Sequence, residues 1–116
     1  MKKIIVTREF TFDSAHSLAN CKNKCSNLHG HTYRLQVSVN GNINKNGMVM
    51  DFSDLKKIVN EGVVSILDHC YLNKLIKQPT AENISIWIWN KLKNKLKLCE
   101  IKLWETPSSF VSYRGD

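Results

Sequence analysis

Two stretches in the first half of the chain alternate apolar and polar residues. The apolar residues of the first stretch, between residues 4 and 14, are Ile4, Val6, Phe10 and Phe12. Those of the second, between residues 31 and 39, are Tyr33, Leu35, Val37 and Val39. Alternation of this kind predicts strands with one buried face. The polar segment between them, Asn20 to Asn27, is predicted to be a loop.

Helical spacing follows in the middle of the chain. Either Asp51 or Ser53 is a suitable cap for a first helix. Its apolar residues recur three and four positions apart and are Leu55, Ile58, Val59, Val63 and Ile66. A second helix is predicted after Pro79, with Thr80 as its cap. One face of it carries Ile84, Trp87, Ile88 and Leu92. Residues 91–98 fit both periods, and we interpret them as a helix that gives way to a loop near Lys95.

The C-terminal part has a two-strand pattern around a turn at residues 106–109. Its apolar residues are Ile101, Leu103, Phe110, Val111 and Tyr113. The element order is therefore β-β-α-α-β-β. This order predicts an α+β fold in which two helices cover one face of an antiparallel sheet. The length of 116 residues is that of a single domain, residues 1–116.

Composition and charge narrow the function only in part. Seventeen Lys and Arg against ten Asp and Glu give a net charge of +7, which favours anionic partners without choosing among them. We expect a cytoplasmic protein without a membrane partner, because no segment has the length and composition of a signal peptide or a membrane span. In that compartment the four cysteines are not expected to form structural disulfides.

The histidines carry the candidate chemistry. His29 and His31 are two residues apart on a predicted strand, so both side chains face one side, and Gly30 between them leaves room for close approach. His16, on a strand that can pair alongside, would complete a set of three imidazoles with an open coordination position, the form typical of catalytic zinc sites. Imidazole ligands suit zinc but also iron, copper or nickel.

Two other interpretations of the same region stay open. Cys21 and Cys25 could join His29 and His31 in a closed Cys₂His₂ structural site, which would leave His16 unexplained. Alternatively, the chain is a zinc-stabilised basic module that binds nucleic acid through its lysines. In the open-site interpretation, Cys25 is an unligated thiol beside a dication, whose field lowers the thiol pKa and makes a base available.

Acidic residues outside the histidine pattern are weaker candidates. Asp68 and His69 are adjacent at a predicted end of a helix, where both could reach one cleft. Glu105 lies in a strand pattern that otherwise buries apolar groups. A buried carboxylate there would recognise a cyclic guanidine-like edge through paired hydrogen bonds.

With these residues assembled, the chain resembles the 6-pyruvoyl-tetrahydropterin synthase family, most closely its bacterial 6-carboxy-5,6,7,8-tetrahydropterin synthase branch. Six ordered motifs carry the resemblance over nearly the whole chain. They are residues 12–16 (FDSAH), 25–31 (CSNLHGH), 47–52 (GMVMDF), 67–73 (LDHCYLN), 79–83 (PTAEN) and 104–106 (WET).

The resemblance implies a tunnelling fold whose subunits close into a barrel and assemble as a homohexamer, a dimer of trimers with active sites between subunits. It implies Zn²⁺ as the cofactor and a small dihydropterin triphosphate, not nucleic acid, as the partner. The site residues that it implies are metal ligands His16, His29 and His31, the base Cys25, the relay pair Asp68 and His69, and the pterin anchor Glu105.

The implied reaction is a step of queuosine biosynthesis that converts 7,8-dihydroneopterin triphosphate to 6-carboxy-5,6,7,8-tetrahydropterin, acetaldehyde and triphosphate. Three residues separate Cys25 from His29, which is similar to the carboxy-forming enzymes; pyruvoyl-forming relatives have a longer interval. A folate-linked branch has glutamate at the position of Cys25. Lys22, Lys24 and Arg114 are candidates for the triphosphate by charge alone, and no role is predicted for Cys21, Cys70 or Cys99.

Overall fold

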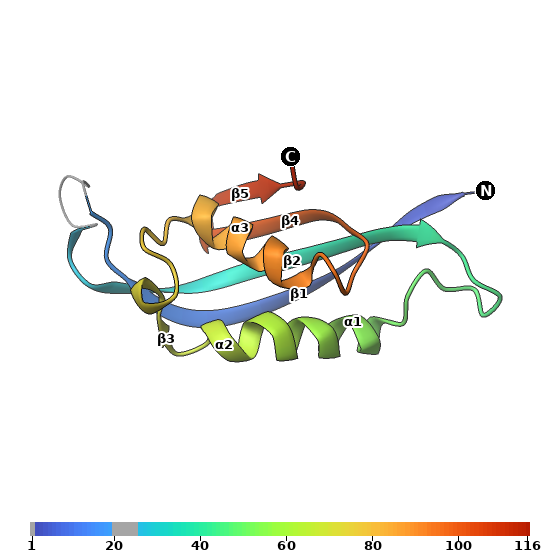
Figure 1. Cartoon of the computed structure of the whole chain (residues 1–116), viewed down its shortest axis with the longest axis horizontal. Helices are drawn as coiled ribbons and strands as arrows, with labels where there is room; N and C mark the ends of the chain where they lie inside the picture. The colour runs from blue at the N-terminus through green and yellow to red at the C-terminus, as the bar shows by residue number, and fades with distance from the viewer. Residues whose placement is uncertain (1, 20–25) are drawn as a thin grey trace.

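Two long strands form the backbone of the fold in the computed structural model, which describes residues 2–19 and 26–116. Strand β1 (Lys3–His16) runs antiparallel to β2 (His29–Asn42) over its full length, from the pair Lys3 and Asn42 to the pair His16 and His29. The molecule is correspondingly elongated, with principal extents of 53 × 24 × 24 Å (Figure 1). Both strands are longer than the alternating apolar residues alone indicate.

The sheet has the strand order β3-β1-β2-β4-β5. Strands β4 (Leu98–Thr106) and β5 (Ser109–Tyr113) are the predicted C-terminal pair, and both run antiparallel to their neighbours. The α+β fold is thus confirmed. One strand was not predicted: β3 (Cys70–Tyr71) pairs in parallel with β1, and its two residues are too few to produce a periodic pattern.

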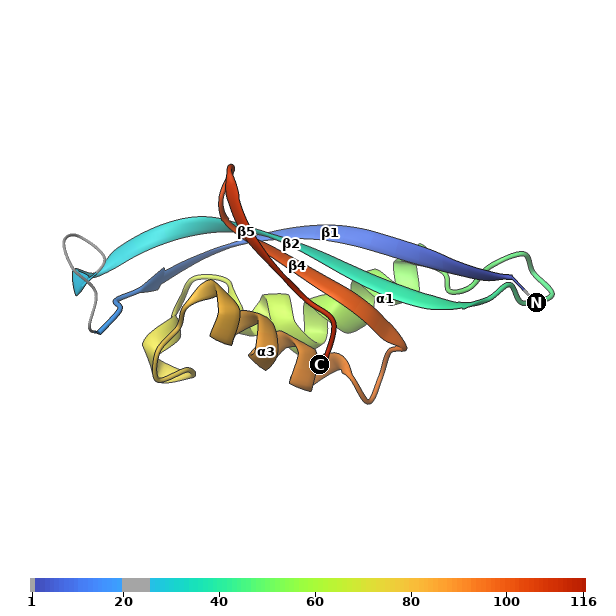
Figure 2. The same cartoon turned by 90° about the horizontal axis from the view of Figure 1, so that it is seen from above.

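The helices lie on one face of the sheet, as predicted (Figure 2). The first is continuous through α1 (Phe52–Val59), the π-helical turn η2 (Asn60–Val64) and α2 (Ser65–Leu67). The second is α3 (Ala81–Leu92), preceded by the short 3-10 helix η3 (Leu72–Lys74). Asp51 caps α1 and Thr80 caps α3. None of the helices in the described ranges is long and apolar enough to cross a membrane.

The core lies between the helices and the inner face of the sheet. The predicted inward residues of the second strand are all buried, and so are Phe10 and Phe12. Ile66 was predicted to face the core, but this is wrong: its side chain is 40% exposed, whereas Leu67 is fully buried.

The π-helical turn explains the difference between Ile66 and Leu67. The buried residues of this helix follow one another at intervals of four and are Leu55, Val59, Val63 and Leu67. In a regular α-helix four residues overshoot one turn by about 40°, so such a row would drift round the helix. The wider turn at Asn60–Val64 takes up this drift, because its hydrogen bonds span five residues. The row therefore stays on the core side.

This arrangement predicts losses of stability of different size for two neighbouring substitutions. Leu67→Ala removes a fully buried side chain and should lower the free energy of unfolding by about 2–5 kcal/mol. Ile66→Ala, the matched control, should cost less than about 1 kcal/mol because that side chain is already partly in water. Urea unfolding followed by circular dichroism measures both. A larger loss for Ile66→Ala would contradict the helical phase described here.

Candidate metal centre

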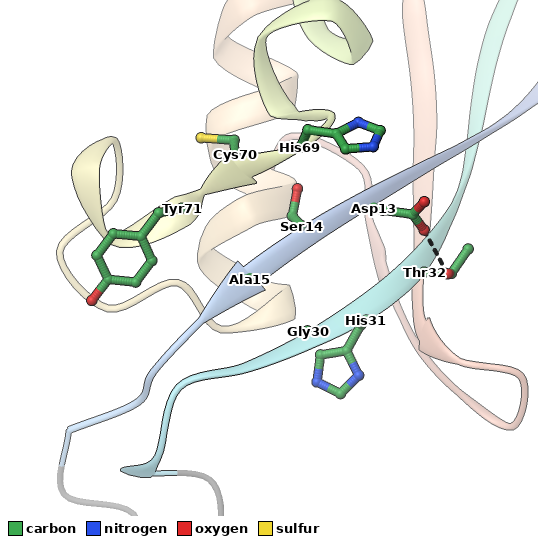
Figure 3. A pocket seen from close by; sticks show the side chains of 9 residues that line it. All are labelled: Asp13, Ser14, Ala15, Gly30, His31, Thr32, His69, Cys70 and Tyr71. Atoms are coloured by element: carbon green, nitrogen blue, oxygen red, sulfur yellow. Dashed lines mark hydrogen bonds between the residues drawn. The ribbon is translucent and has the colours of Figure 1, made fainter.

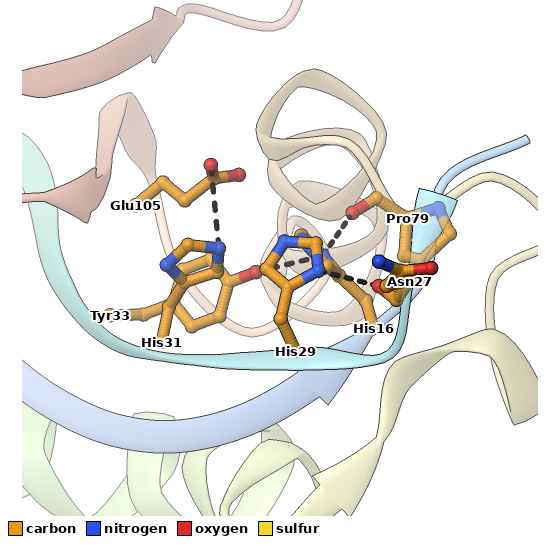
Figure 4. Close-up of polar contacts among 7 residues, drawn as sticks. All are labelled: His16, Asn27, His29, His31, Tyr33, Pro79 and Glu105. Carbon is orange, nitrogen blue, oxygen red and sulfur yellow. Dashed lines mark hydrogen bonds and ion pairs between the residues drawn. The ribbon is translucent and has the colours of Figure 1, made fainter. Parts of the chain in front are cut away.

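Pairing of β1 with β2 brings the three predicted histidine ligands together. His16 lies directly opposite His29, and Ser14 opposite His31, so the three imidazoles share the inner face of the sheet. Their ring centroids are 4.6 to 5.2 Å apart. Nitrogen atoms of all three lie within 4.8 Å of one another. Figure 4 shows the imidazoles side by side, with Glu105 above His31.

Hydrogen bonds from two of the rings fix which nitrogen carries the proton. His16 Nδ1 lies 3.0 Å from the carbonyl oxygen of Pro79, and His29 Nδ1 lies 2.7 Å from that of Asn27. A carbonyl oxygen only accepts, so each Nδ1 is the donor and each neutral ring keeps an unprotonated Nε2. Metal-binding histidines are typically held in this way, with the second nitrogen bonded to a backbone carbonyl.

The unprotonated nitrogens fit a metal ion. The Nε2 atoms of His16 and His29 are 3.1 Å apart, and two lone pairs at that distance repel unless a proton or a cation lies between them. Ligand nitrogens at about 2.0–2.1 Å from a tetrahedral zinc are about 3.3 Å apart. Among the described residues, the buried His31 Nε2 makes no hydrogen bond. A third nitrogen is therefore free to act as a ligand.

Burial favours the neutral, metal-binding form of His16 and His31. Burial lowers the pKa of His16, an effect that the nearby Glu105 carboxylate opposes and the other two imidazoles reinforce. Burial likewise lowers the pKa of His31, again opposed by Glu105 and reinforced by His29. The neutral imidazole is the form that binds a metal. Tyr33, whose hydroxyl is 3.1 Å from His16 Nδ1, has a raised pKa because of burial and the carboxylate.

The lowered pKa values predict how the metal-free protein responds to acid. In the unfolded chain these histidines take up protons near their ordinary pKa of 6.5, whereas the folded chain takes them up only at lower pH. The unfolded state therefore binds more protons below about pH 6.5, and stability falls as the pH decreases through this window. We expect the Tm of the metal-free protein to be flat from pH 8 to pH 7 and to fall between about pH 6.5 and pH 5.

Two controls accompany this measurement. Saturating metal should move the fall in Tm to lower pH, because the ligated nitrogens cannot be protonated without releasing the ion. His31→Gln should reduce the slope of the metal-free curve, since one proton uptake is lost. A Tm that rises as the pH falls from 6.5 would contradict the sign of the effect.

The predicted anchor Glu105 lies next to this cluster. Its carboxylate, on β4, is 3.6 Å from His31 Nε2, and its side chain is 29% exposed. Glu105 also lines a cleft of about 250 Å³ together with Leu18, Thr80 and Phe110. A carboxylate at the side of an apolar cleft, beside a candidate metal centre, can orient a flat polar ring while the ring's substituent reaches the histidines.

Asp68 and His69 form a separate cluster with Asp13. Asp68 Oδ1 accepts a hydrogen bond of 2.9 Å from the Asp13 backbone N–H, and Asp68 Oδ2 lies 3.1 Å from His69 Nδ1. The Asp13 N–H bond lowers the pKa of the Asp68 carboxyl. His69 has a positive φ of 57°, an uncommon conformation for a residue with a side chain. Sequence reasoning missed Asp13, whose only sign is its place beside Ser14 and Ala15 in one motif.

The two clusters lie on opposite faces of β1. Asp13 alternates with Phe12 and Ser14, which are buried on the histidine side, so the Asp13 side chain faces the other way. There it accepts a 2.5 Å hydrogen bond from Thr32 Oγ1. Figure 3 shows both residues with His69 at a cleft of about 540 Å³. The structure thus brings Glu105, but not Asp68 and His69, to the three histidines of the same chain.

The remaining predicted residues fall into two groups. Cys21, Lys22, Lys24 and Cys25 lie outside the described residues. Of the four ligands in the closed Cys₂His₂ alternative, the structure therefore describes only His29 and His31. His16, which that alternative does not use, lies in the same cluster. Arg114 is 72% exposed, with its Nε 3.4 Å from Glu100. Cys70 and Cys99 are free thiols, and burial raises the pKa of Cys99.

Comparisons with known proteins agree on the family and the fold. The profile of the family described as 6-pyruvoyl tetrahydropterin synthase matches residues 5–116. The 6-carboxy-5,6,7,8-tetrahydropterin synthase of Haemophilus influenzae is 39% identical and covers 94% of this chain and 97% of its own. The dihydroneopterin monophosphate aldolase of Pyrococcus furiosus is 46% identical, with coverage of 90% and 91%. The solved 6-pyruvoyl tetrahydropterin synthase of Caenorhabditis elegans superposes with a TM-score of 0.89 at 30% identity, over 100% and 98% of the two chains.

Proposed function

The chain belongs to the 6-pyruvoyl tetrahydropterin synthase family and is an enzyme of that family; on this premise we propose that it forms 6-carboxy-5,6,7,8-tetrahydropterin. The proposed reaction takes 7,8-dihydroneopterin triphosphate and water and releases acetaldehyde and triphosphate, as a cytoplasmic step of queuosine biosynthesis. The observation that carries the proposal is the cluster of three imidazoles, His16 buried and His29 and His31 half-buried, beside the Glu105 carboxylate. It combines a metal site with a ring-recognition group at one end of the sheet.

In this proposal His16, His29 and His31 hold Zn²⁺, which supplies Lewis acidity to the hydroxyl oxygens of the substrate side chain. Glu105 accepts hydrogen bonds from the N–H groups of the pterin ring and so sets which carbon lies over the histidines. Cys25 removes the carbon-bound proton. The pair Asp68 and His69 passes protons to and from the substrate oxygen.

The position of Asp68 and His69 makes the proposed site depend on assembly. In one chain they lie across β1 from the histidines, so their part in the reaction requires the pair of a neighbouring subunit. Open edges of the sheet support association: β3 covers only Ser14 and Ala15 of β1, and within the described residues the outer edge of β5 has no strand partner. Open edges favour pairing with another chain.

We expect a homohexamer, with six times the mass of one chain in native mass spectrometry. A monomer that turns over substrate would contradict this.

Product analysis tests the proposed reaction directly. Zinc-loaded protein incubated with 7,8-dihydroneopterin triphosphate should release one acetaldehyde, trapped as its hydrazone, for each carboxy-pterin seen by liquid chromatography and mass spectrometry. Release of triphosphate with a pyruvoyl-pterin and no acetaldehyde would instead identify the runner-up, 6-pyruvoyl-tetrahydropterin synthesis.

A second candidate has a specific basis in the aldolase of Pyrococcus furiosus, which is 46% identical. Dihydroneopterin monophosphate should therefore be assayed in parallel at the same concentration. Preferential consumption of the monophosphate would replace the proposed reaction with an aldolase reaction. Salt-dependent RNA binding without turnover of either pterin would support the nucleic-acid-binding alternative.

A further inference from the structure

The outer edge of β1 next to the candidate metal centre is covered by one short segment, residues 68–78. Along a strand, the N–H and C=O groups of alternate residues point to the same edge. On this edge, the Asp13 N–H donates to the Asp68 carboxylate, and the Asp13 carbonyl accepts a 2.6 Å hydrogen bond from the His69 N–H. At Ala15 it faces Tyr71 of β3. The next two alternate residues, Ser17 and Ala19, lie beyond the ends of both β1 and β3.

Side-chain amides replace a strand at those two positions. The Ser17 N–H donates to Asn73 Oδ1 over 3.0 Å, and Asn73 Nδ2 donates to the Ser17 carbonyl over 2.9 Å. The Ala19 N–H donates to Gln78 Oε1 over 3.0 Å, and Gln78 Nε2 donates to the Ala19 carbonyl over 2.7 Å. A carboxamide presents a donor and an acceptor side by side. Each side chain thus makes the pair of hydrogen bonds that a neighbouring strand residue would make.

The same segment also holds the His16 ring. Pro79, directly after Gln78, supplies the carbonyl that accepts from His16 Nδ1. The Gln78 carbonyl in turn accepts a 2.9 Å hydrogen bond from Asn83 Nδ2 on α3. The segment of residues 73–79 therefore contacts both the His16 ring, through the Pro79 carbonyl, and the backbone that follows His16, through two side-chain amides. The point of attachment is the first turn of α3, whose inner face is buried in the core.

We propose that Asn73 and Gln78 are positioning residues of the three-histidine centre, which hold Ser17 and Ala19 so that His16 Nε2 stays directed at His29. The inference rests on the proposed metal site. Without the two amides, the backbone of Ser17 and Ala19 loses its hydrogen bonds to residues 68–78, the Ser17 hydroxyl keeps only its 3.4 Å contact with Tyr71 in that segment, and the Pro79 carbonyl is no longer tied to this backbone through Gln78. Changes in the outer partners of metal ligands typically weaken metal binding by about 10- to 100-fold. We expect about 10-fold for each single substitution and more for the pair.

The test compares Asn73→Ala, Gln78→Ala and the double variant with wild type and with Gln36→Ala. Gln36 is the matched control: its Nε2 donates to a Glu9 carboxylate oxygen over 2.6 Å, and it lies five residues beyond His31 on β2, roughly 16 Å along the strand. Zinc affinity is measured by competition with a chromophoric chelator, and ligand geometry by the visible absorption of the Co²⁺-loaded protein. Both are recorded well below the Tm of every variant, so a loss of overall stability alone does not change them.

The expected result is weaker zinc binding and an altered Co²⁺ spectrum in the Asn73 and Gln78 variants, with the Gln36 variant like wild type. Gln78→Glu, which keeps the acceptor for Ala19 N–H but loses the donor, should fall between Gln78→Ala and wild type. Unchanged affinity and an unchanged spectrum in the double variant would overturn the inference. If wild type binds metal and turns over substrate, and the variants have the same zinc affinity and Co²⁺ spectrum as wild type, this inference fails while the proposed function stands.

A second readout needs no metal. In the metal-free protein, amide hydrogen exchange at Ser17 and Ala19 reports whether the hydrogen bonds to Asn73 and Gln78 are formed. The NMR signal of the His16 Nδ1 proton reports separately on the imidazole ring. Both amides should exchange faster in the double variant, and the imidazole signal should shift or broaden. Faster exchange with an unshifted His16 signal would overturn the positioning role. Wild type that binds no metal at all would reject the proposed function, and the inference with it.

Discussion

His31→Ala is expected to abolish metal binding and turnover together. Its Nε2 is the buried nitrogen that makes no hydrogen bond within the described part of the chain, so alanine removes a ligand without breaking a hydrogen bond there. The Glu105 carboxylate loses only its 3.6 Å contact with the ring. The loss of zinc affinity should exceed the about 10- to 100-fold effect of changing an outer partner. Metal content after dialysis, measured by inductively coupled plasma mass spectrometry, and the acetaldehyde assay check the two effects on the same sample.

His69→Ala is the matched control, since it removes a histidine that lies outside the cluster. It should keep the full complement of zinc and lose turnover, which separates the metal ligands from the proposed relay. Full zinc occupancy in His31→Ala would show that the ion is held elsewhere, and the three-histidine centre would then be rejected.

Cys25→Ala, like His69→Ala, is expected to keep its full zinc content and to lose turnover, here by about 10²- to 10⁴-fold, the usual contribution of a general base. The reason is that three imidazole nitrogens already provide the donors of an open catalytic site, and a base must remain unligated to accept a proton. Zinc content and single-turnover rates with the triphosphate substrate measure the two quantities independently.

Zinc loss in the cysteine variant would mean that Cys25 is a ligand, which would favour the closed Cys₂His₂ site.

Periodic patterns in the sequence predicted the parts of the fold that depend on burial. Alternation from Tyr33 to Val39 predicted a strand whose inner residues are all buried, because burying one face of a strand imposes a period of two. Strand β3 was missed since its pairing is decided by where the helix ends, not by its own residues. Ile66 fits the spacing of a regular α-helix but is exposed, because the π-helical turn keeps residues four apart on the core side as far as Leu67.

In the candidate site, too, the sequence predicts only the residues whose position follows from a local pattern. His29-Gly30-His31 is recognisable because side chains two residues apart on a strand share a face. The partners that orient the rings are not recognisable, because two of them, Asn27 and Pro79, act through backbone carbonyls, and any residue has a carbonyl. Tyr33 was predicted only as an apolar strand residue, although its hydroxyl reaches His16. Such contacts depend on how distant segments meet in space.

The length of the π-helical turn also bears on Asp68 and His69, which follow immediately after α2. Successive residues of an α-helix are about 100° apart round its axis. Deleting one residue within Asn60–Val64 would leave Leu67 eleven positions after Leu55, and eleven residues of a regular α-helix make about three turns. Leu67 would therefore stay on the core side, and Asp68 would still leave the helix toward the Asp13 N–H. Inserting one further residue would instead rotate the exit of the helix by roughly 100°, so insertions in this turn are constrained by two residues that the turn does not contain.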